Sequence, residues 1–285
     1  MLNSSKLDCN VCDNLKKVKL WFLIPAVIIL LVISVYFIFI SNDSFTNAYV
    51  SVQKDLFYYL NSKLSKLPAL QNNLTQLGDV LIFFPLITIF FIYSPKLWEA
   101  LITSALLSLI VSAVLKKLFA MPRPAAVFDT TSFTIIGKTL NGKTSLPSGH
   151  SIATFVVITI LLFAFMPKKN IYKIIWSFFI LSVGFIIGLS RVGVGAHYPL
   201  DVLIGCTLGY IVVVLGIILN GKLNWLSWIS YKKAAPFFIL LFLIWGAVII
   251  KKIIDTNLPI CYLSVAALVI TISIMSSIYY VQRKN

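Results

Sequence analysis

The chain has 285 residues, of which 59% are hydrophobic and only 12% charged, and its mean hydropathy is +0.96. Soluble proteins carry roughly a quarter charged residues, so this composition excludes a soluble globular enzyme. Sparse glycine and proline and only four cysteines exclude collagen-like, disordered and disulfide-scaffold classes. The net charge of +15 lies mostly in short segments between apolar stretches, where lysine and arginine meet anionic head groups, so no nucleic-acid partner is expected.

Eight apolar stretches approach or exceed the length of about 20 residues that a helix needs to cross a bilayer. They are residues 20–40, 77–94, 97–115, 149–166, 172–190, 199–219, 235–250 and 258–280. The first is too long for a typical signal-peptide core and lacks a small-residue cleavage site, so we interpret it as a retained signal anchor. The sequence thus predicts an all-α, polytopic membrane protein.

The basic residues predict the orientation of these spans. With the N-terminus in the cytoplasm, 13 of the 24 lysines and arginines fall in cytoplasmic segments. Of the 11 outside, we assign Lys116, Arg123 and Arg191 to chemistry below, which leaves 8. This positive-inside bias predicts that both termini are cytoplasmic.

The segment 41–76 between the first two spans is polar enough to lie outside the membrane. Its apolar residues suggest an amphipathic helix on the outer surface, and a plain connecting helix fits equally well; they are Phe57, Tyr58, Leu60, Leu64 and Leu67.

The longest later polar stretch is 120–148, between the third and fourth spans. The Asn141-Gly142 dipeptide is a strong turn signal, and Phe133, Ile135 and Ile136 precede it. We expect a small hairpin folded over the membrane surface, and a loop of this length is more often functional than idle.

Three polar clusters are candidates for chemistry. The first contains Lys116, Arg123 and Pro124, at the outer end of the third span. Cations at the edge of the hydrocarbon tend to pair, to extend toward water or to hold a ligand. A planar guanidinium together with an ammonium suits a phosphoryl group.

The second cluster is Pro147-Ser148-Gly149-His150, directly before an apolar run. Ser148 can cap a helix there, Gly149 lets the backbone approach a ligand, and the free N–H groups make an anion site. A capped transmembrane helix with an incidental histidine is the alternative.

The third cluster is Ser190-Arg191, followed by His197 and Asp201. A histidine and an aspartate four residues apart fall on one helix face, so the carboxylate can orient the imidazole and leave its other nitrogen basic. Because an even number of crossings separates the clusters, all three reach the same side of the membrane. His150 and His197 are the only histidines in the chain.

These residues resemble the signature of the type 2 phosphatidic acid phosphatase (PAP2) family. Its three parts, Lys-x6-Arg-Pro, Pro-Ser-Gly-His and Ser-Arg-x5-His-x3-Asp, appear in order from Lys116, Pro147 and Ser190 without a departure. The resemblance implies a cytoplasmic tail over 1–19, a six-helix transmembrane catalytic core over 20–220, and an extension of two transmembrane helices over 221–285.

By the same resemblance, His197 attacks phosphorus, Asp201 orients it and His150 protonates the leaving oxygen. The phosphoryl oxygens would be held by Lys116, Arg123, Ser148, Gly149 and Arg191. Because these cations replace a metal and no cluster has metal-ligand spacing, we expect no cofactor.

The expected activity is that of a lipid phosphatase in a bacterial inner membrane, with its site on the periplasmic or outer face. Candidate substrates are undecaprenyl diphosphate, phosphatidylglycerol phosphate, phosphatidic acid and lipid A phosphates. A phosphotransferase that passes the phosphate to a second lipid shares the same signature and stays open.

Overall fold

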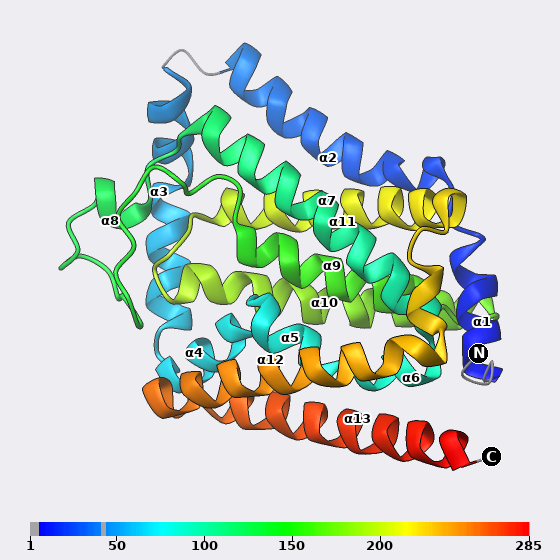
Figure 1. The fold of residues 1–285 in the computed structure, drawn as a ribbon. Coiled ribbons are helices and arrows are strands. Elements are labelled where there is room, and N and C mark those ends of the chain that lie inside the picture. Colours follow the sequence, from blue (N-terminus) through cyan, green and yellow to red (C-terminus); the bar gives the residue numbers. More distant parts are fainter. Residues whose placement is uncertain (1–5, 41–43, 285) are drawn as a thin grey trace.

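The computed structural model describes residues 6–40 and 44–284, and across these ranges the ordered elements are all helical (Figure 1). The long helices run roughly alongside one another, and the first and last of them bring both ends of the chain to the same end of the bundle. The predicted all-helical class is confirmed.

Within these described ranges, six helical stretches are long and apolar enough to cross a membrane. They are Leu20–Phe39, which contains α2 (Ile24–Val35), and the helices α7 (Pro95–Phe119), α10 (Asn170–Gly193), α11 (Pro199–Leu223), α12 (Ala235–Thr256) and α13 (Pro259–Lys284). At about 1.5 Å of rise per residue, helices of 22 to 26 residues exceed the hydrocarbon thickness of about 30 Å. These helices match six of the eight predicted spans.

A seventh predicted span, 149–166, forms a shorter helix, α9 (Gly149–Ala164). The N-terminal helix α1 (Lys6–Leu15) covers its far end, where Nδ2 of Asn14 donates to the carbonyl oxygens of Ala164 and Met166, both at 3.1 Å. These bonds satisfy carbonyls that the end of a helix leaves free.

The predicted continuous span 77–94 is wrong. This segment forms two short helices, α5 (Val80–Leu86) and α6 (Ile89–Tyr93). Pro85 lies inside α5 and has no N–H, so the carbonyl of Leu81 loses its helical donor. The apolar run reads as one span, but its proline divides the helix.

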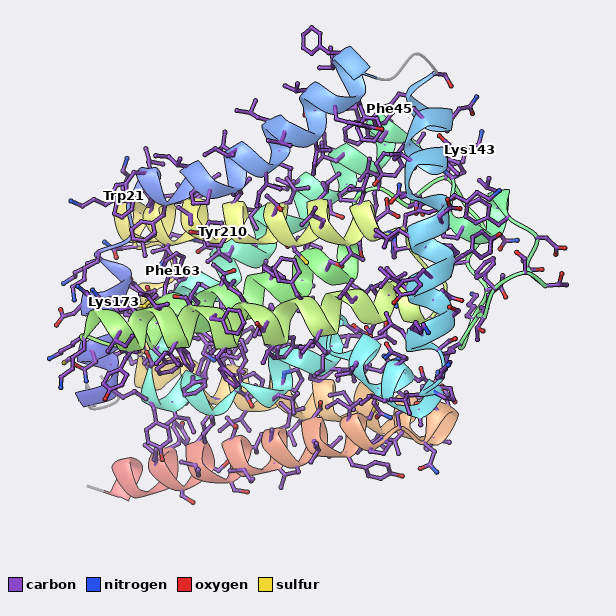
Figure 2. The ribbon with its side chains drawn as sticks, turned by 180° about the vertical axis from the view of Figure 1, so that it is seen from behind. Trp21, Phe45, Lys143, Phe163, Lys173 and Tyr210 are labelled. Atoms are coloured by element: carbon purple, nitrogen blue, oxygen red, sulfur yellow. The ribbon has the colours of Figure 1, made fainter. Side chains whose placement is uncertain are left out.

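Large apolar side chains cover the outside of the bundle. Phe178 on α10 is 76% exposed and Ile254 on α12 is 79% exposed. A soluble monomer rarely exposes so many such residues, and a lipid environment accounts for them. Trp21 and Lys173 lie at one end of the bundle and Lys143 at the other, as expected of residues in the two head-group layers (Figure 2).

Glycines four residues apart bring the central helices into close contact. On α11, a Cβ atom on Gly205 or Gly209 would lie 2.7 Å from a carbonyl oxygen of the α9 segment, of Ser148 or Ile152. On α10, a Cβ atom on Gly184 would lie 3.0 Å from the Phe155 ring. Small residues at this spacing let membrane helices pack closely, so α9 sits tightly between α10 and α11.

Helix α3 (Phe45–Leu64) crosses the end of the bundle at a steep angle to the long helices and leads into α4 (Pro68–Gln76) (Figure 1). Its buried stripe repeats every four residues: Tyr49, Gln53, Phe57 and Asn61. A helix over the predicted segment is therefore present, but the face it buries is half polar. The side chains of Gln53 and Asn61 bond to backbone groups of other segments, which is what makes their burial possible.

The hairpin predicted within 120–148 is wrong as well, because no strand forms in this stretch. Two backbone bonds close the base of the loop, from Arg123 N to Gly142 O at 2.9 Å and from Ser145 N to Met121 O at 2.9 Å. Phe133 packs on Phe57 of α3, with ring centroids 5.2 Å apart. The apolar residues thus anchor the loop to a helix instead of pairing it with itself.

Candidate active site

The three polar clusters meet at the end of the bundle opposite the two chain termini, where α7 and α10 end and α9 and α11 begin (Figure 1). Opposite running directions bring the four helix ends together there. The loop 120–148 and helix α3 flank this region.

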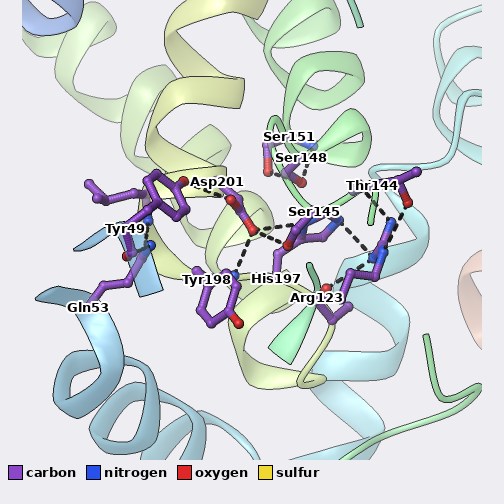
Figure 3. Close-up of polar contacts among 12 residues, drawn as sticks. Tyr49, Gln53, Arg123, Thr144, Ser145, Ser148, Ser151, His197, Tyr198 and Asp201 are labelled. Carbon is purple, nitrogen blue, oxygen red and sulfur yellow. Dashed lines mark hydrogen bonds and ion pairs between the residues drawn. The ribbon is translucent and has the colours of Figure 1, made fainter. Parts of the chain in front are cut away.

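His197 and Asp201 form the centre of the candidate site. Nδ1 of His197 lies 3.3 Å from Oδ2 of Asp201, and both side chains are buried (Figure 3). The expectation that the two share a helix face is wrong, because α11 begins at Pro199 and His197 precedes it. Tyr198, the residue before Pro199, has an extended backbone, because a residue before a proline avoids helical dihedrals. Asp201, in the first turn of α11, therefore reaches back to the histidine.

Three further donors hold the Asp201 carboxylate. Oδ1 accepts from the hydroxyl of Tyr49 at 2.8 Å, and Oδ2 accepts from the hydroxyl of Ser145 at 2.5 Å and from the backbone N–H of Tyr198 at 2.9 Å. A buried carboxylate requires such compensation. The carboxylate is thereby held in one orientation toward the imidazole.

The guanidinium of Arg123 faces the other imidazole nitrogen. Its Nη1 lies 3.3 Å from Nε2 of His197 and 3.0 Å from the carbonyl oxygen of Ala196. Arginine only donates, so Nε2 accepts and Nδ1 carries the proton toward Asp201. Thr144 holds the guanidinium from the far side through its hydroxyl and its carbonyl oxygen, both at 3.4 Å. This tautomer leaves a lone pair on Nε2.

Ser148 caps α9, as the sequence predicts. Its hydroxyl accepts from the N–H of Ser151 at 3.3 Å, and its own N–H donates to the carbonyl oxygen of Asp201 at 3.1 Å. Lys116, in the last turn of α7, reaches this helix start, because a Cβ atom on Gly149 would lie 3.2 Å from its Nζ. An ammonium group thus lies beside a helix N-terminus, an arrangement suited to an anion.

Arg191 enters the site from the last turn of α10 and is only 7% exposed. Its Nη1 donates to the hydroxyl of Thr75 at 2.5 Å. Its Nε is buried and has no hydrogen-bond partner among the residues that the structure describes. A buried guanidinium with a spare donor is suited to an oxyanion.

His150, in the first turn of α9, packs against Gly78. A Cβ atom on Gly78 would lie 2.6 Å from Cβ of His150, so these two residues are in direct contact. The positive charges of Arg191 and Lys116 act electrostatically on His150. The second histidine therefore lies close to the cations of the other two clusters.

Burial controls the protonation of His197. Desolvation lowers the pKa of this imidazole from 6.5 to about 4, although the Asp201 carboxylate opposes the shift. Burial likewise raises the pKa of Tyr49 well above 10, and the carboxylate raises it further, so the tyrosine stays a neutral donor. Near neutral pH the imidazole is therefore neutral, with its one proton on Nδ1 and a lone pair on Nε2.

The residues that support this centre lie outside the three sequence motifs and were not predicted; they are Tyr49, Gln53, Thr75, Thr144 and Ser145. For Tyr49 and Gln53 the one available signal was their spacing. They lie four residues apart on α3, on the helix face that is buried. Thr144 and Ser145 lie in a loop, where no periodicity marks a buried residue, and Thr75 lies in the last turn of the short helix α4.

No cluster of three or more histidine, cysteine, aspartate or glutamate side chains placed to hold a metal ion occurs within residues 6–40 and 44–284. Cys206 and Cys261 are buried among apolar residues, as their positions in apolar spans predict.

Comparison with known proteins agrees with these motifs. Residues 97–225, which contain all eight predicted site residues, match the model of the PAP2 superfamily. An undecaprenyl-diphosphatase of Sulfolobus acidocaldarius is 26% identical over 199 residues, which cover 68% of this chain and 88% of that protein. The crystal structure of Aquifex aeolicus LpxE aligns with a TM-score of 0.49 and 27% identity, over 59% of this chain and 95% of that one.

Six apolar helices, three complete motifs at one end of the bundle and the family match define a multi-pass membrane phosphatase. The segment that matches the PAP2 superfamily, residues 97–225, makes up a little under half of the chain and carries all three motifs.

Proposed function

We propose that this protein hydrolyses the phosphomonoester or diphosphate of a membrane lipid through a phosphohistidine on His197. The observation that carries the proposal is that each imidazole nitrogen of His197 has its own partner. Nδ1 lies 3.3 Å from Oδ2 of Asp201, and Nε2 lies 3.3 Å from Nη1 of Arg123. An oriented imidazole whose free lone pair faces a positive group is the arrangement that nucleophilic attack on a phosphoryl group needs.

In the first step, Nε2 of His197 forms a bond to phosphorus while the bond to the leaving oxygen breaks, and His150 gives that oxygen a proton. In the second step, water attacks the phosphohistidine, the N–P bond breaks, and His150 takes a proton from the water as inorganic phosphate departs. The charge that builds on the phosphoryl oxygens is stabilised by Lys116, Arg123, Ser148, Gly149 and Arg191.

These cations supply the positive charge that a metal provides in other phosphatases, so we propose a metal-independent reaction. Lys116, Arg123 and Arg191 come from three different segments, and Lys116 interacts electrostatically with both arginines. Activity in the presence of a chelator tests this point directly.

The position of the site supports a lipid substrate. It lies at one end of a bundle whose outer surface is apolar, so a head group bound there would leave its tail in the bilayer. The similarity to a protein named for undecaprenyl diphosphate makes that lipid the first substrate to test, followed by phosphatidylglycerol phosphate, phosphatidic acid and lipid A phosphates. We place the protein in a bacterial inner membrane, with the site outside and both termini cytoplasmic.

The test measures phosphate release by purified protein from these lipid phosphates in detergent, with EDTA present. Wild type should release phosphate, while His197→Ala should show neither turnover nor an acid-labile phosphoenzyme. Lys117→Ala, an exposed neighbour of Lys116 in the same helical turn, is the matched control for Lys116→Ala.

Normal turnover by His197→Ala would remove the nucleophile from the proposal, and dependence on an added divalent ion would overturn the metal-free site. Release only when a second lipid is supplied as acceptor would identify a phosphotransferase instead.

A further inference from the structure

The last two helices do more than extend the bundle, because they satisfy the backbone of the broken segment α5–α6. Nε1 of Trp245 on α12 donates to the carbonyl oxygen of Leu81 at 3.0 Å, the group that Pro85 leaves without a helical donor. The hydroxyl of Ser264 on α13 donates to the carbonyl oxygen of Ile82 at 2.9 Å. Without such partners, a broken helix is costly in a membrane.

The same two helices also hold the turn that precedes α5. Nζ of Lys252 on α12 lies 2.6 Å from Oδ2 of Asp79, and Oδ1 of Asp79 accepts from the N–H of Leu81 at 3.0 Å. At the start of α13, the N–H of Ile260 donates to Oδ1 of Asn73 at 3.2 Å. Both carboxylate oxygens of Asp79 are therefore engaged, one within α5 and one across to α12.

The end of α4 and this turn, together residues 75–79, form one wall of the candidate site. It carries Gly78, which contacts Cβ of His150, and Thr75, which accepts from Arg191. Backbone bonds from Gly78 N to Thr75 O at 3.1 Å and from Asp79 N to Gln76 O at 2.9 Å make the turn a compact unit. Movement of Asp79 would therefore be transmitted to Gly78.

We propose that Lys252 is a positioning residue for His150, acting through Asp79 and Gly78, and that the α12–α13 pair serves to hold this wall of the site. Lys252 touches neither phosphate nor leaving group in this scheme. The catalytic role of His150 rests on the proposed function, whereas its placement by Lys252 does not.

The placement is tested by NMR of protein with 13C-labelled histidine. Because the chain has two histidines, the spectrum holds one Cε1–H signal from each of them, and His150→Gln assigns these two signals. Lys252→Met should move the His150 signal and leave that of His197 in place. The double variant Asp79→Asn/Lys252→Met, which keeps the local net charge, should also move it, whereas Lys252→Arg and the exposed neighbour Lys251→Met should not.

A kinetic test distinguishes positioning from general damage. A general acid matters most for a poor leaving group. For Lys252→Met, kcat should fall roughly tenfold with an alkyl lipid phosphate, a part of the 10²–10⁴-fold that general acids supply. It should change less than about twofold with an aryl phosphate, whose leaving group needs little protonation. Equal losses with both substrates would indicate general damage and would overturn the proposal.

An unchanged His150 signal in Lys252→Met would also overturn the proposal, and so would a raised KM at unchanged kcat, which would make Lys252 a substrate-binding residue. Absence of phosphate release by wild type would defeat the proposed function, and the NMR result would still decide the placement of His150.

Discussion

The hydroxyl of Tyr49 lies 2.8 Å from Oδ1 of Asp201, and this bond joins α3, which crosses the end of the bundle, to the first turn of α11. Tyr49 is fully buried and its high pKa keeps it a donor. The orientation of His197 therefore depends on a helix outside the matched family segment.

Replacing Tyr49 with phenylalanine removes a donor from a buried carboxylate. A hydrogen bond to a charged group contributes about 1.5–3 kcal/mol, so the variant should unfold at a lower temperature by several degrees. Tyr59→Phe, at a 59% exposed position of the same helix, is the control and should behave like wild type in thermal unfolding in detergent. Equal melting of the two variants would show that the bond adds nothing to stability.

Replacing Asp201 with asparagine should affect activity far more than folding. The amide can donate to Nδ1 of His197, which forces the proton onto Nε2 and removes the lone pair that faces Arg123. Loss of the correct tautomer costs about 10⁴-fold in kcat in a serine protease, and a loss of that order is expected here. Phosphoenzyme trapping and kcat measure it, with Asp129→Asn in the exposed loop as the control. A loss below about tenfold would contradict the tautomer argument.

The pH dependence of the nucleophile should follow its lowered pKa. Because the neutral imidazole is the reactive form, attack is lost only as the pH falls through about 4, the pKa of buried His197, and not through 6.5. The folded protein thus binds fewer protons than the unfolded chain between these values, so stability also decreases as the pH falls through this window. NMR titration of the His197 signal gives the midpoint directly, and a midpoint near 6.5 would be inconsistent with desolvation.

Close packing of α9 on α11 should control both stability and activity. A Cβ atom on Gly209 would lie 2.6 Å from Cβ of Phe155 and 2.7 Å from the carbonyl oxygen of Ile152, so Gly209→Ala must push α9 away and displace Ser148 and His150. Overpacking costs about 1–3 kcal/mol. Gly221→Ala on the same helix meets nothing within 4 Å and should be neutral or slightly stabilising. Melting temperature and phosphate release, compared between the two, measure the effect. Equal melting temperatures and equal phosphate release for Gly209→Ala and Gly221→Ala would contradict a role for close packing at Gly209.

Much of the architecture could be predicted because a bilayer makes apolar length informative. Seven of the predicted spans are helices at the expected places, and Ser148 caps α9 as predicted. The exception is the segment 77–94, which is as apolar as a span but contains Pro85. Whether a membrane helix tolerates a proline depends on whether neighbouring helices supply a donor for the carbonyl that the proline leaves free. Trp245 does so from a helix more than 150 residues away in the chain.

The sequence by itself determined the all-helical class and seven of the eight apolar helices, and it predicted eight candidate site residues, because hydropathy and fixed motif spacings are local properties of a chain. Only the tertiary structure decided which groups surround them. Tyr49, Thr75 and Ser145 reach the site from segments outside the three motifs, and Lys252 contacts Asp79 beside it. A hydrogen bond between distant segments depends on how helices pack, and packing is a property of the whole fold.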